Sequence, residues 1–411
     1  MNKTLILFSL MIISASAIAQ SSKQIVYPVT IGNKVSDNYF GTVVPDPYRW
    51  LENDTAQNVK DWVKKENAVT HSYIDSIPFR KNLEARLKDL YNYTRVSSPF
   101  REGEYYFFSK NEGGLQNQSV IYYQKGIDGT PSVFLDPNTL SKDGTTSASI
   151  LGFSSDHKTA CISVQRAGSD WQEIFVKEVK NKSLLEDHIM YCKFSSISWK
   201  GDEGFYYSGY DRPDESHKFS AKTQYQKIFF HKMGTQQDQD VLVFEDRNNP
   251  LLYKSAALSE DQRWLMLTLS QGTDGSELRF LDLQAPEKND FRVLSAGYSI
   301  NQDFIENVKG KFLVHTNAGA PNYRVVLIDP MQPDPKNWKT LIPETTLKLD
   351  AVHLVGQRLF CSYLENACSK VNIHTLDGKF ESTLKLPGLG TVSGFEGGLH
   401  DEEAFYTFTS F

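Results

Sequence analysis

Residues that could carry hydrolytic chemistry are present, but their spacing matches no catalytic motif. A serine nucleophile on an α/β sheet usually stands in a G-x-S-x-G elbow, where a strained strand-to-helix turn exposes its hydroxyl. The nearest candidate is the stretch GTVSG (390–394), in which the serine is one position too late and no helical pattern follows. We therefore predict that this chain contains no catalytic residue.

The histidines do not form a metal motif. A zinc site needs ligands at short, regular spacings, as in H-E-x-x-H, and no such pair occurs. We predict neither a metal nor a cofactor. Three of the histidines lie in strand-like runs, where a structural role is expected: His231, His315 and His374. The others are His71, His157, His188, His217, His353 and His400.

Adjacent carboxylates and paired glycines are equally uninformative about chemistry. Asp202 and Glu203 are sequence neighbours, so on a strand or turn their side chains diverge and are expected to be solvated. The same holds for Glu402 and Glu403. The glycine pairs at 113–114 and 397–398 open no helix, which argues against phosphate binding.

Composition and the N-terminus limit the class of protein. The chain has 411 residues, 40% hydrophobic and 23% charged, and a net charge of −6, so a nucleic-acid partner is not expected. Lys3, an apolar run over 5–13 and the sequence Ala17-Ile18-Ala19 form a signal-peptide pattern, too short to span a bilayer. We expect residues 1–19 to be removed after Ala19, leaving a periplasmic or secreted monomer without a membrane segment.

The four cysteines stand singly among apolar residues, as buried free thiols do. Export would permit disulfides, and Cys361 and Cys368 could flank a hairpin turn. Both readings remain open from the sequence. The remaining two cysteines are Cys161 and Cys192.

Two helices are predicted in a segment covering residues 20–90. Asp54 is expected to cap the first, with Gln57 completing a capping box. Its apolar face repeats at helical spacing and Pro78 ends it. The second has Phe79, Leu83, Leu87 and Leu90 on one stripe.

From residue 91 onward the helical period gives way to short alternating strands separated by turns. The stretch 152–180 resembles 257–284: each has Ser-x-Asp, a strand, Gly-x-Asp and a second strand, with Ser154 and Ser259 105 residues apart. Weaker copies at about 40–52 residues are typical of propeller blades. The Ser-x-Asp residues are expected to bond the backbone of tight turns. We predict a mainly β, seven-bladed propeller over residues 91–411.

The last predicted blade begins near Val392 and has room for only two strands. An unfinished blade leaves an exposed strand edge, which soluble proteins usually avoid. The sequence therefore favours a propeller that is truncated in its last blade, in a chain that is a fragment of a longer protein.

Five motifs in order resemble the prolyl oligopeptidase family, over residues 26 to 411. They are DPYRWLEN (46–53), GGLQNQSVIYY (113–123), VFLDPNTLSKDGTTS (133–147), GSDWQEI (168–174) and APNYRVVLID (320–329). The resemblance implies a serine endopeptidase that cleaves short peptides after proline. It also implies a propeller that selects substrates by size, and an α/β-hydrolase domain formed by later sequence, with which the helical segment 20–90 associates. This chain alone is then expected to be inactive.

The resemblance also implies three substrate-binding positions. Phe194 in KFSSISW (193–199) corresponds to a family phenylalanine that reaches the peptide pocket, although a place in the blade core is an equal alternative. Tyr253 and Thr273 fall near two other pocket positions, where relatives can carry sulfur-containing side chains. The expected partners are short proline-containing peptides and the hydrolase domain.

Two other functions fit a secreted propeller. The first is a stand-alone binding module for peptides or glycans. The second is a propeller with its own active site, such as a glycosidase, although no convergent acid cluster is visible in the sequence.

Overall fold

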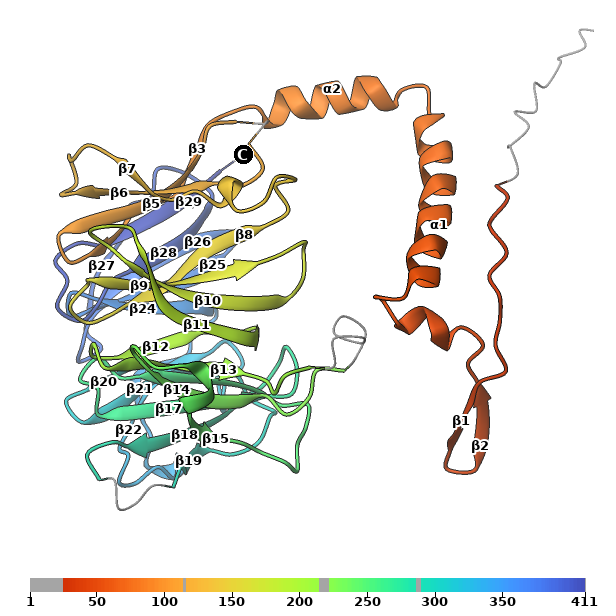
Figure 1. Ribbon diagram of the computed structural model, residues 1–411. Helices are drawn as coiled ribbons and strands as arrows, with labels where there is room; N and C mark the ends of the chain where they lie inside the picture. The colour runs from red at the N-terminus through yellow and green to blue at the C-terminus, as the bar shows by residue number, and fades with distance from the viewer. Residues whose placement is uncertain (1–24, 114–115, 214–221, 286–289, 411) are drawn as a thin grey trace, which may run out of the picture. The chain divides into compact units, whose positions relative to one another are not determined.

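The computed structural model describes residues 25–113, 116–213, 222–285 and 290–410 (Figure 1). The chain divides into two compact units, Met1–Glu84 and Ala85–Phe411, each described here by itself. The predicted signal peptide, residues 1–19, lies outside the described residues.

The first unit is built around one long helix. It contains the hairpin β1 (Ser36–Tyr39) and β2 (Thr42–Pro45), the 3₁₀ turn η1 (Arg49–Glu52) and α1 (Gln57–Asp75). Two tryptophans tie the preceding segment down: Trp62 Nε1 donates to Thr30 Oγ1 at 2.9 Å, and Trp50 Nε1 donates to the Ile31 carbonyl at 2.8 Å. The division between the units falls within α2 (Arg80–Tyr91).

The predicted capping box of α1 is wrong. The residue that caps the helix is Ala56, which offers no side-chain hydrogen bond, and Gln57 Nε2 instead donates to Asp61 Oδ1 at 2.9 Å. Because the helix begins at Gln57, Asp54 lies too far upstream to reach its first N–H groups.

The second unit consists of antiparallel sheets that follow one another in chain order (Figure 1). The first sheet contains β3 (Arg95–Val96), β4 (Phe100–Glu102), β5 (Tyr105–Asn111), β6 (Val120–Lys125) and β7 (Ser132–Leu135). The next two are β8 (Ser147–Phe153), β9 (Thr159–Gln165), β10 (Trp171–Glu178), β11 (Leu184–Lys193), and β12 (Ile197–Lys200), β13 (Gly204–Gly209), β14 (Lys227–Lys232), β15 (Val241–Phe244).

The remaining sheets continue the same pattern. Two are β16 (Tyr253–Leu258), β17 (Trp264–Ser270), β18 (Glu277–Asp282), β19 (Arg292–Ser295), and β20 (Gln302–Val308), β21 (Lys311–Thr316), β22 (Arg324–Ile328), β23 (Lys339–Ile342). They are followed by β24 (Lys348–Val355), β25 (Arg358–Glu365), β26 (Cys368–Thr375), β27 (Phe380–Thr383), and then β28 (Thr391–Glu396) with β29 (Phe405–Thr409).

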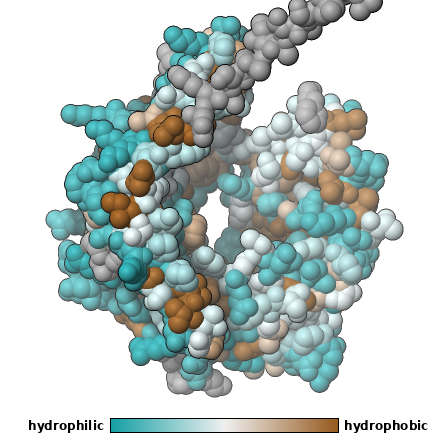
Figure 2. All heavy atoms as spheres, turned by 90° about the vertical axis from the view of Figure 1, so that its right-hand side faces the viewer, coloured by the Kyte–Doolittle hydropathy of each residue, from teal (hydrophilic) through white to brown (hydrophobic). Residues whose placement is uncertain are grey.

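These sheets are the blades of a β-propeller. The first strands of neighbouring sheets contact each other, as β12 does with both β8 and β16, so they surround a central channel, whose opening Figure 2 shows. Six blades with four or five strands are present among the described residues. The predicted count of seven is not confirmed, because β28 and β29 form only a hairpin. That hairpin contacts the first blade, where Thr407 Oγ1 donates to Ser98 Oγ at 3.2 Å.

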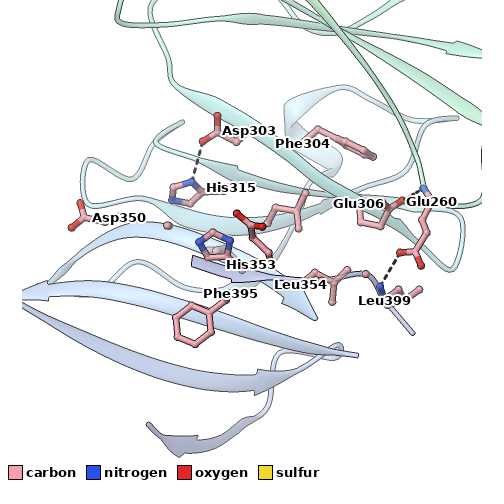
Figure 3. Close-up of a pocket in the computed structure, with 16 residues that line it drawn as sticks. Glu260, Asp303, Phe304, Glu306, His315, Asp350, His353, Leu354, Phe395 and Leu399 are labelled. Carbon is pink, nitrogen blue, oxygen red and sulfur yellow. Dashed lines mark hydrogen bonds and ion pairs between the residues drawn. The ribbon is translucent and has the colours of Figure 1, made fainter. Parts of the chain in front are cut away.

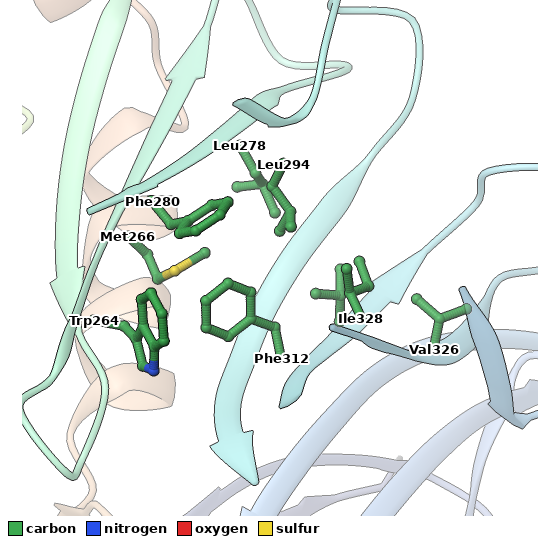
Figure 4. Packing of buried hydrophobic residues seen from close by; sticks show 9 residues of the cluster. Trp264, Met266, Leu278, Phe280, Leu294, Phe312, Val326 and Ile328 are labelled. Atoms are coloured by element: carbon green, nitrogen blue, oxygen red, sulfur yellow. The ribbon is translucent and has the colours of Figure 1, made fainter. Parts of the chain in front are cut away.

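Apolar side chains between adjacent blades form the core. Figure 4 shows the cluster between the sheets β16–β19 and β20–β23, in which Trp264, Phe280 and Phe312 meet at ring-centroid distances of 5.2–5.7 Å. The alternating pattern of each strand turns one apolar face toward each neighbouring blade, so every blade contributes to two interfaces.

The Ser-x-Asp repeats have the predicted structural role. Ser154 Oγ donates to Asp156 Oδ1 at 2.8 Å and accepts from the Thr159 backbone N–H at 3.1 Å. Ser259 repeats the arrangement with Asp261 at 2.5 Å. Each pair closes the turn between the first two strands of a blade.

All four cysteines are free thiols, and three are buried. Cys361 faces Asn372 and Cys368 faces Glu365 in the β25–β26 register, so the hairpin disulfide is not formed. The strand histidines are structural as predicted: His231 lies between two carboxylates, and His315 Nε2 donates to the Leu349 carbonyl at 3.0 Å. His374 Nδ1 bonds the Gly378 carbonyl at 3.1 Å.

Candidate functional site

Two of the three positions implied by the family resemblance meet in the structure. Phe194 directly follows β11, and Tyr253 is the first residue of β16. Their rings lie edge to face, with centroids 5.8 Å apart and planes at 78°. Both rings remain open to solvent, Phe194 at 57% and Tyr253 at 41% exposure. Phe194 is therefore not a blade-core residue.

The backbone at Phe194 is strained. Its φ is +52°, in the left-handed region that a bulky residue rarely adopts. Such strain persists only where the surrounding structure enforces it, and it often occurs at binding sites. Here it presents a large apolar ring to solvent at the end of a strand.

A cavity of about 370 Å³ lies beside the aromatic pair. Its lining combines the two rings with small polar side chains, namely Ser255, Thr268 and Ser270. Thr273 does not reach this cavity. It lines a neighbouring cavity of about 340 Å³, which shares Thr268, Ser270 and Gly272 with the first. The third implied position is thus close to the pair but on a separate wall.

Further side chains extend the aromatic surface and were not predicted. Lys193 Nζ lies 5.7 Å from the Phe194 ring centroid and 5.6 Å from that of Trp171. Trp171 in turn meets Tyr210 edge to face at 5.9 Å. Trp171 belongs to the GSDWQEI motif, so the sequence held a cue, but nothing local linked it to Phe194. The whole surface can stack rings and place one ammonium group beside them.

A second cavity, of about 520 Å³, lies along the first strands β20, β24 and β28 (Figure 3). Its lining includes five carboxylates and two histidines: Glu260, Asp303, Glu306, Asp350, Glu396, His315 and His353. These carboxylates come from separate blades, which explains why no acid cluster was visible in the sequence. The cavity is part of the channel wall.

Hydrogen bonds link distant blades at one end of this cavity. The Glu260 carboxylate accepts the Leu399 backbone N–H at 2.8 Å, and the Glu260 backbone N–H donates to Glu306 Oε1 at 3.0 Å (Figure 3). Nearby, Gln262 Nε2 donates to Ser155 Oγ at 3.0 Å, joining the turns of two non-adjacent blades. The blade turns at this end are therefore coupled to one another.

Replacing Glu306 with glutamine is expected to stabilise the protein above neutral pH. Burial raises the pKa of Glu306 from 4.5 to about 7, with Glu260 and Asp261 adding to the effect, while two backbone N–H groups oppose it. The native state thus holds this proton more tightly, so the contribution to stability is complete below pH 4.5 and is lost as the pH rises through about 7. Glutamine keeps the acceptor oxygen without the charge.

We expect Glu306→Gln to be more stable than the unsubstituted chain by about 2 kcal/mol at pH 8, and nearly equal to it at pH 4.5. Urea unfolding at the two pH values measures the difference. A difference that is the same at both values would contradict this account of Glu306.

The structure offers no elbow at the serine considered above. Ser393 lies within β28 and faces Thr407 in the strand pair, not in a strand-to-helix turn. Within the described ranges, no three His, Cys, Asp or Glu side chains are grouped so that they could hold a metal ion. No described helix is both long enough and apolar enough to cross a membrane.

Comparison with protein families gives a match over residues 27–411 to a model described as "Prolyl oligopeptidase, N-terminal beta-propeller domain". Among curated proteins, the prolyl endopeptidase of Elizabethkingia miricola is 39% identical over 397 residues, which is 97% of this chain and 56% of that protein. The prolyl endopeptidase of Dictyostelium discoideum is 30% identical, covering 85% of this chain and 54% of the relative. The chain thus spans little more than half the length of these relatives.

Solved structures give the same similarity. One, from a study of two prolyl endopeptidases and their inter-domain dynamics, is 32% identical with a TM-score of 0.83, covering 94% of this chain and 57% of the other. Another, prolyl oligopeptidase B of Galerina marginata bound to a 35mer substrate, is 26% identical with a TM-score of 0.80 and the same coverage.

Proposed function

Because this chain belongs to the prolyl oligopeptidase family, we propose that it supplies the N-terminal segment and propeller of an exported serine endopeptidase that cleaves short peptides after proline. In this proposal, the aromatic pair of Phe194 and Tyr253 forms the propeller's part of the peptide-binding site. Catalysis requires an α/β-hydrolase domain, the expected partner of the propeller.

The observation that carries the proposal is the exposed, strained Phe194 beside Tyr253. A ring held at a left-handed position contributes little to the core, so its exposure calls for another role. Aromatic rings stack well on proline and on other apolar side chains. The adjacent hydroxyl-rich cavity supplies hydrogen-bonding groups for a peptide backbone.

The finer parts of the proposal rest on the sequence and the family. We infer that β28 and β29 belong to a seventh blade and that the central channel selects substrates by size. Export, with the mature protein in the periplasm or secreted as a monomer, rests on the pattern of residues 1–19. Thr273 is placed on the more distant wall of the site.

Replacing Phe194 with alanine is expected to weaken peptide binding about fivefold, because a buried aromatic contact contributes about 1 kcal/mol. The probe is acetyl-Phe-Gly-Pro-amide, titrated into the 411-residue chain and followed by NMR chemical shifts. Phe380→Ala is a matched control, since Phe380 is 52% exposed on another blade.

Three outcomes separate the alternatives. Equal affinity for both variants would contradict the role of Phe194. Binding of a glycan panel in place of the peptide would favour a stand-alone binding module. Turnover of a chromogenic proline peptide by this chain, abolished by a serine-directed inhibitor, would show that the catalytic machinery lies here and not in a further domain.

A further inference from the structure

A buried glutamine joins the two backbone segments that carry the aromatic pair. Gln226 directly precedes β14 and is 1% exposed. Its Nε2 donates to the Lys193 carbonyl at 3.0 Å, and its Oε1 accepts the Lys254 backbone N–H at 2.6 Å. Lys193 precedes Phe194 and Lys254 follows Tyr253, so one amide side chain touches the neighbour of each ring.

Other buried hydrogen bonds support the same two segments. Ser208 Oγ donates to the Lys254 carbonyl at 2.6 Å, while the Ser208 backbone N–H donates to Ser195 Oγ at 3.0 Å. The Ser195 backbone N–H in turn donates to Gln172 Oε1 at 2.9 Å. Both serines are nearly inaccessible to solvent. Phe194 therefore lies between residues whose backbones are fixed by buried polar groups.

This arrangement has a cost that packing alone would not require. A buried amide contributes little net stability when paired, but it is expensive when left unpaired. An apolar side chain of the same shape could fill the space. Glutamine differs from it in one respect, since it sets the distance and register between two strands from different blades.

We propose that Gln226 is a positioning residue of the candidate peptide-binding site, which holds Phe194 and Tyr253 at the separation that a ligand side chain needs. The proposal rests on the function proposed above. Gln226 itself does not contact the ligand. It acts through the backbone at Lys193 and Lys254.

The first test replaces Gln226 with methionine, which keeps the length of the side chain and removes both hydrogen bonds. Gln237→Met is the matched control, because Gln237 also bridges backbone groups, those of Met190, at 2.9 and 3.0 Å in the same blade. The readouts are affinity for acetyl-Phe-Gly-Pro-amide, NOE contacts between the Phe194 and Tyr253 rings, and hydrogen exchange of the Lys254 amide.

We expect Gln226→Met to lose the ring contacts, to exchange the Lys254 amide faster, and to bind the peptide roughly fivefold to tenfold more weakly. Gln237→Met should leave all three readouts unchanged. Unchanged ring contacts and affinity in Gln226→Met would overturn the proposal. If the unsubstituted chain does not bind the peptide, the proposed function fails, and the ring contacts still decide whether Gln226 positions the pair.

A second variant covers the case in which Gln226→Met does not fold. In Gln226→Glu, a protonated carboxyl can donate to the Lys193 carbonyl and accept from the Lys254 amide, as glutamine does, whereas the ionised form cannot donate. Burial raises the pKa of a carboxyl in such a site. Ring contacts and affinity should therefore be near normal at pH 5 and lost at pH 8. An effect independent of pH would refute the positioning role.

Discussion

Replacing His231 with leucine is expected to lower the free energy of unfolding by about 3–5 kcal/mol, because it leaves two buried carboxylates without their partner. The His231 side chain is fully buried; its Nδ1 bonds Asp240 Oδ1 at 2.7 Å and its Nε2 bonds Asp187 Oδ1 at 3.0 Å. Tyr207 completes the network by donating to Asp240 Oδ2 at 2.7 Å. The network joins β11 of one blade to β14 of the next.

The same network predicts the direction of the pH dependence. Burial acts to lower the pKa of His231, but the hydrogen bonds and charges of Asp240 and Asp187 outweigh it, and the net pKa is raised above 6.5. A raised histidine pKa means that the native state holds the proton more tightly. Its contribution is therefore complete below pH 6.5 and is lost as the pH rises through the native-state value.

Urea unfolding of the chain at pH 6 and at pH 9 measures both effects. His188→Leu is the matched control, because His188 lies on the same strand, is 36% exposed, and pairs with Glu173 at 3.0 Å. An exposed pair of this kind contributes at most about 1 kcal/mol. If His231→Leu proved no more destabilising than His188→Leu, or its deficit grew from pH 6 to pH 9, the charged network would not be the source of the stability.

The sequence predicted those features whose partners lie close together along the chain. The Ser-x-Asp turns were predicted because Ser154, Asp156 and Thr159 are near neighbours, and their hydrogen bonds depend on little else. Strand alternation predicted the propeller, and the short stretch after Val392 predicted a last sheet of two strands. The cap of α1 was wrong because its position depends on where the first helical turn begins, which no single residue determines.

Features that depend on several blades left no trace in the sequence. Gln226 lies 33 residues from one hydrogen-bond partner and 28 from the other, and an isolated glutamine has no local signature. The channel carboxylates are brought together only when the blades form a ring. Phe194 and Tyr253 were named from the family resemblance alone. The sequence gave no way to decide between core and surface, because a left-handed φ at a phenylalanine is not encoded by its neighbours.

Replacing Phe312 with alanine is expected to cost about 3–5 kcal/mol, the usual loss when a large side chain leaves a cavity in a rigid core. Phe312 has no solvent exposure and meets four aromatic rings or apolar neighbours across a blade interface (Figure 4). The centroids of Trp264 and Phe280 lie 5.2 Å from its own, and that of Phe304 lies at 5.7 Å. Edge-to-face pairs add to the loss of buried area.

The distribution of this loss tests how the propeller is held together. Because each blade packs mainly on its two neighbours, Phe312→Ala should speed hydrogen exchange most in β16–β19 and β20–β23, and least in the first blade. Phe312→Leu, which refills most of the space, should recover more than half of the stability. Uniform acceleration of exchange throughout the second unit would instead mean that the ring opens only as a whole, so that any single blade interface limits the stability of all the others.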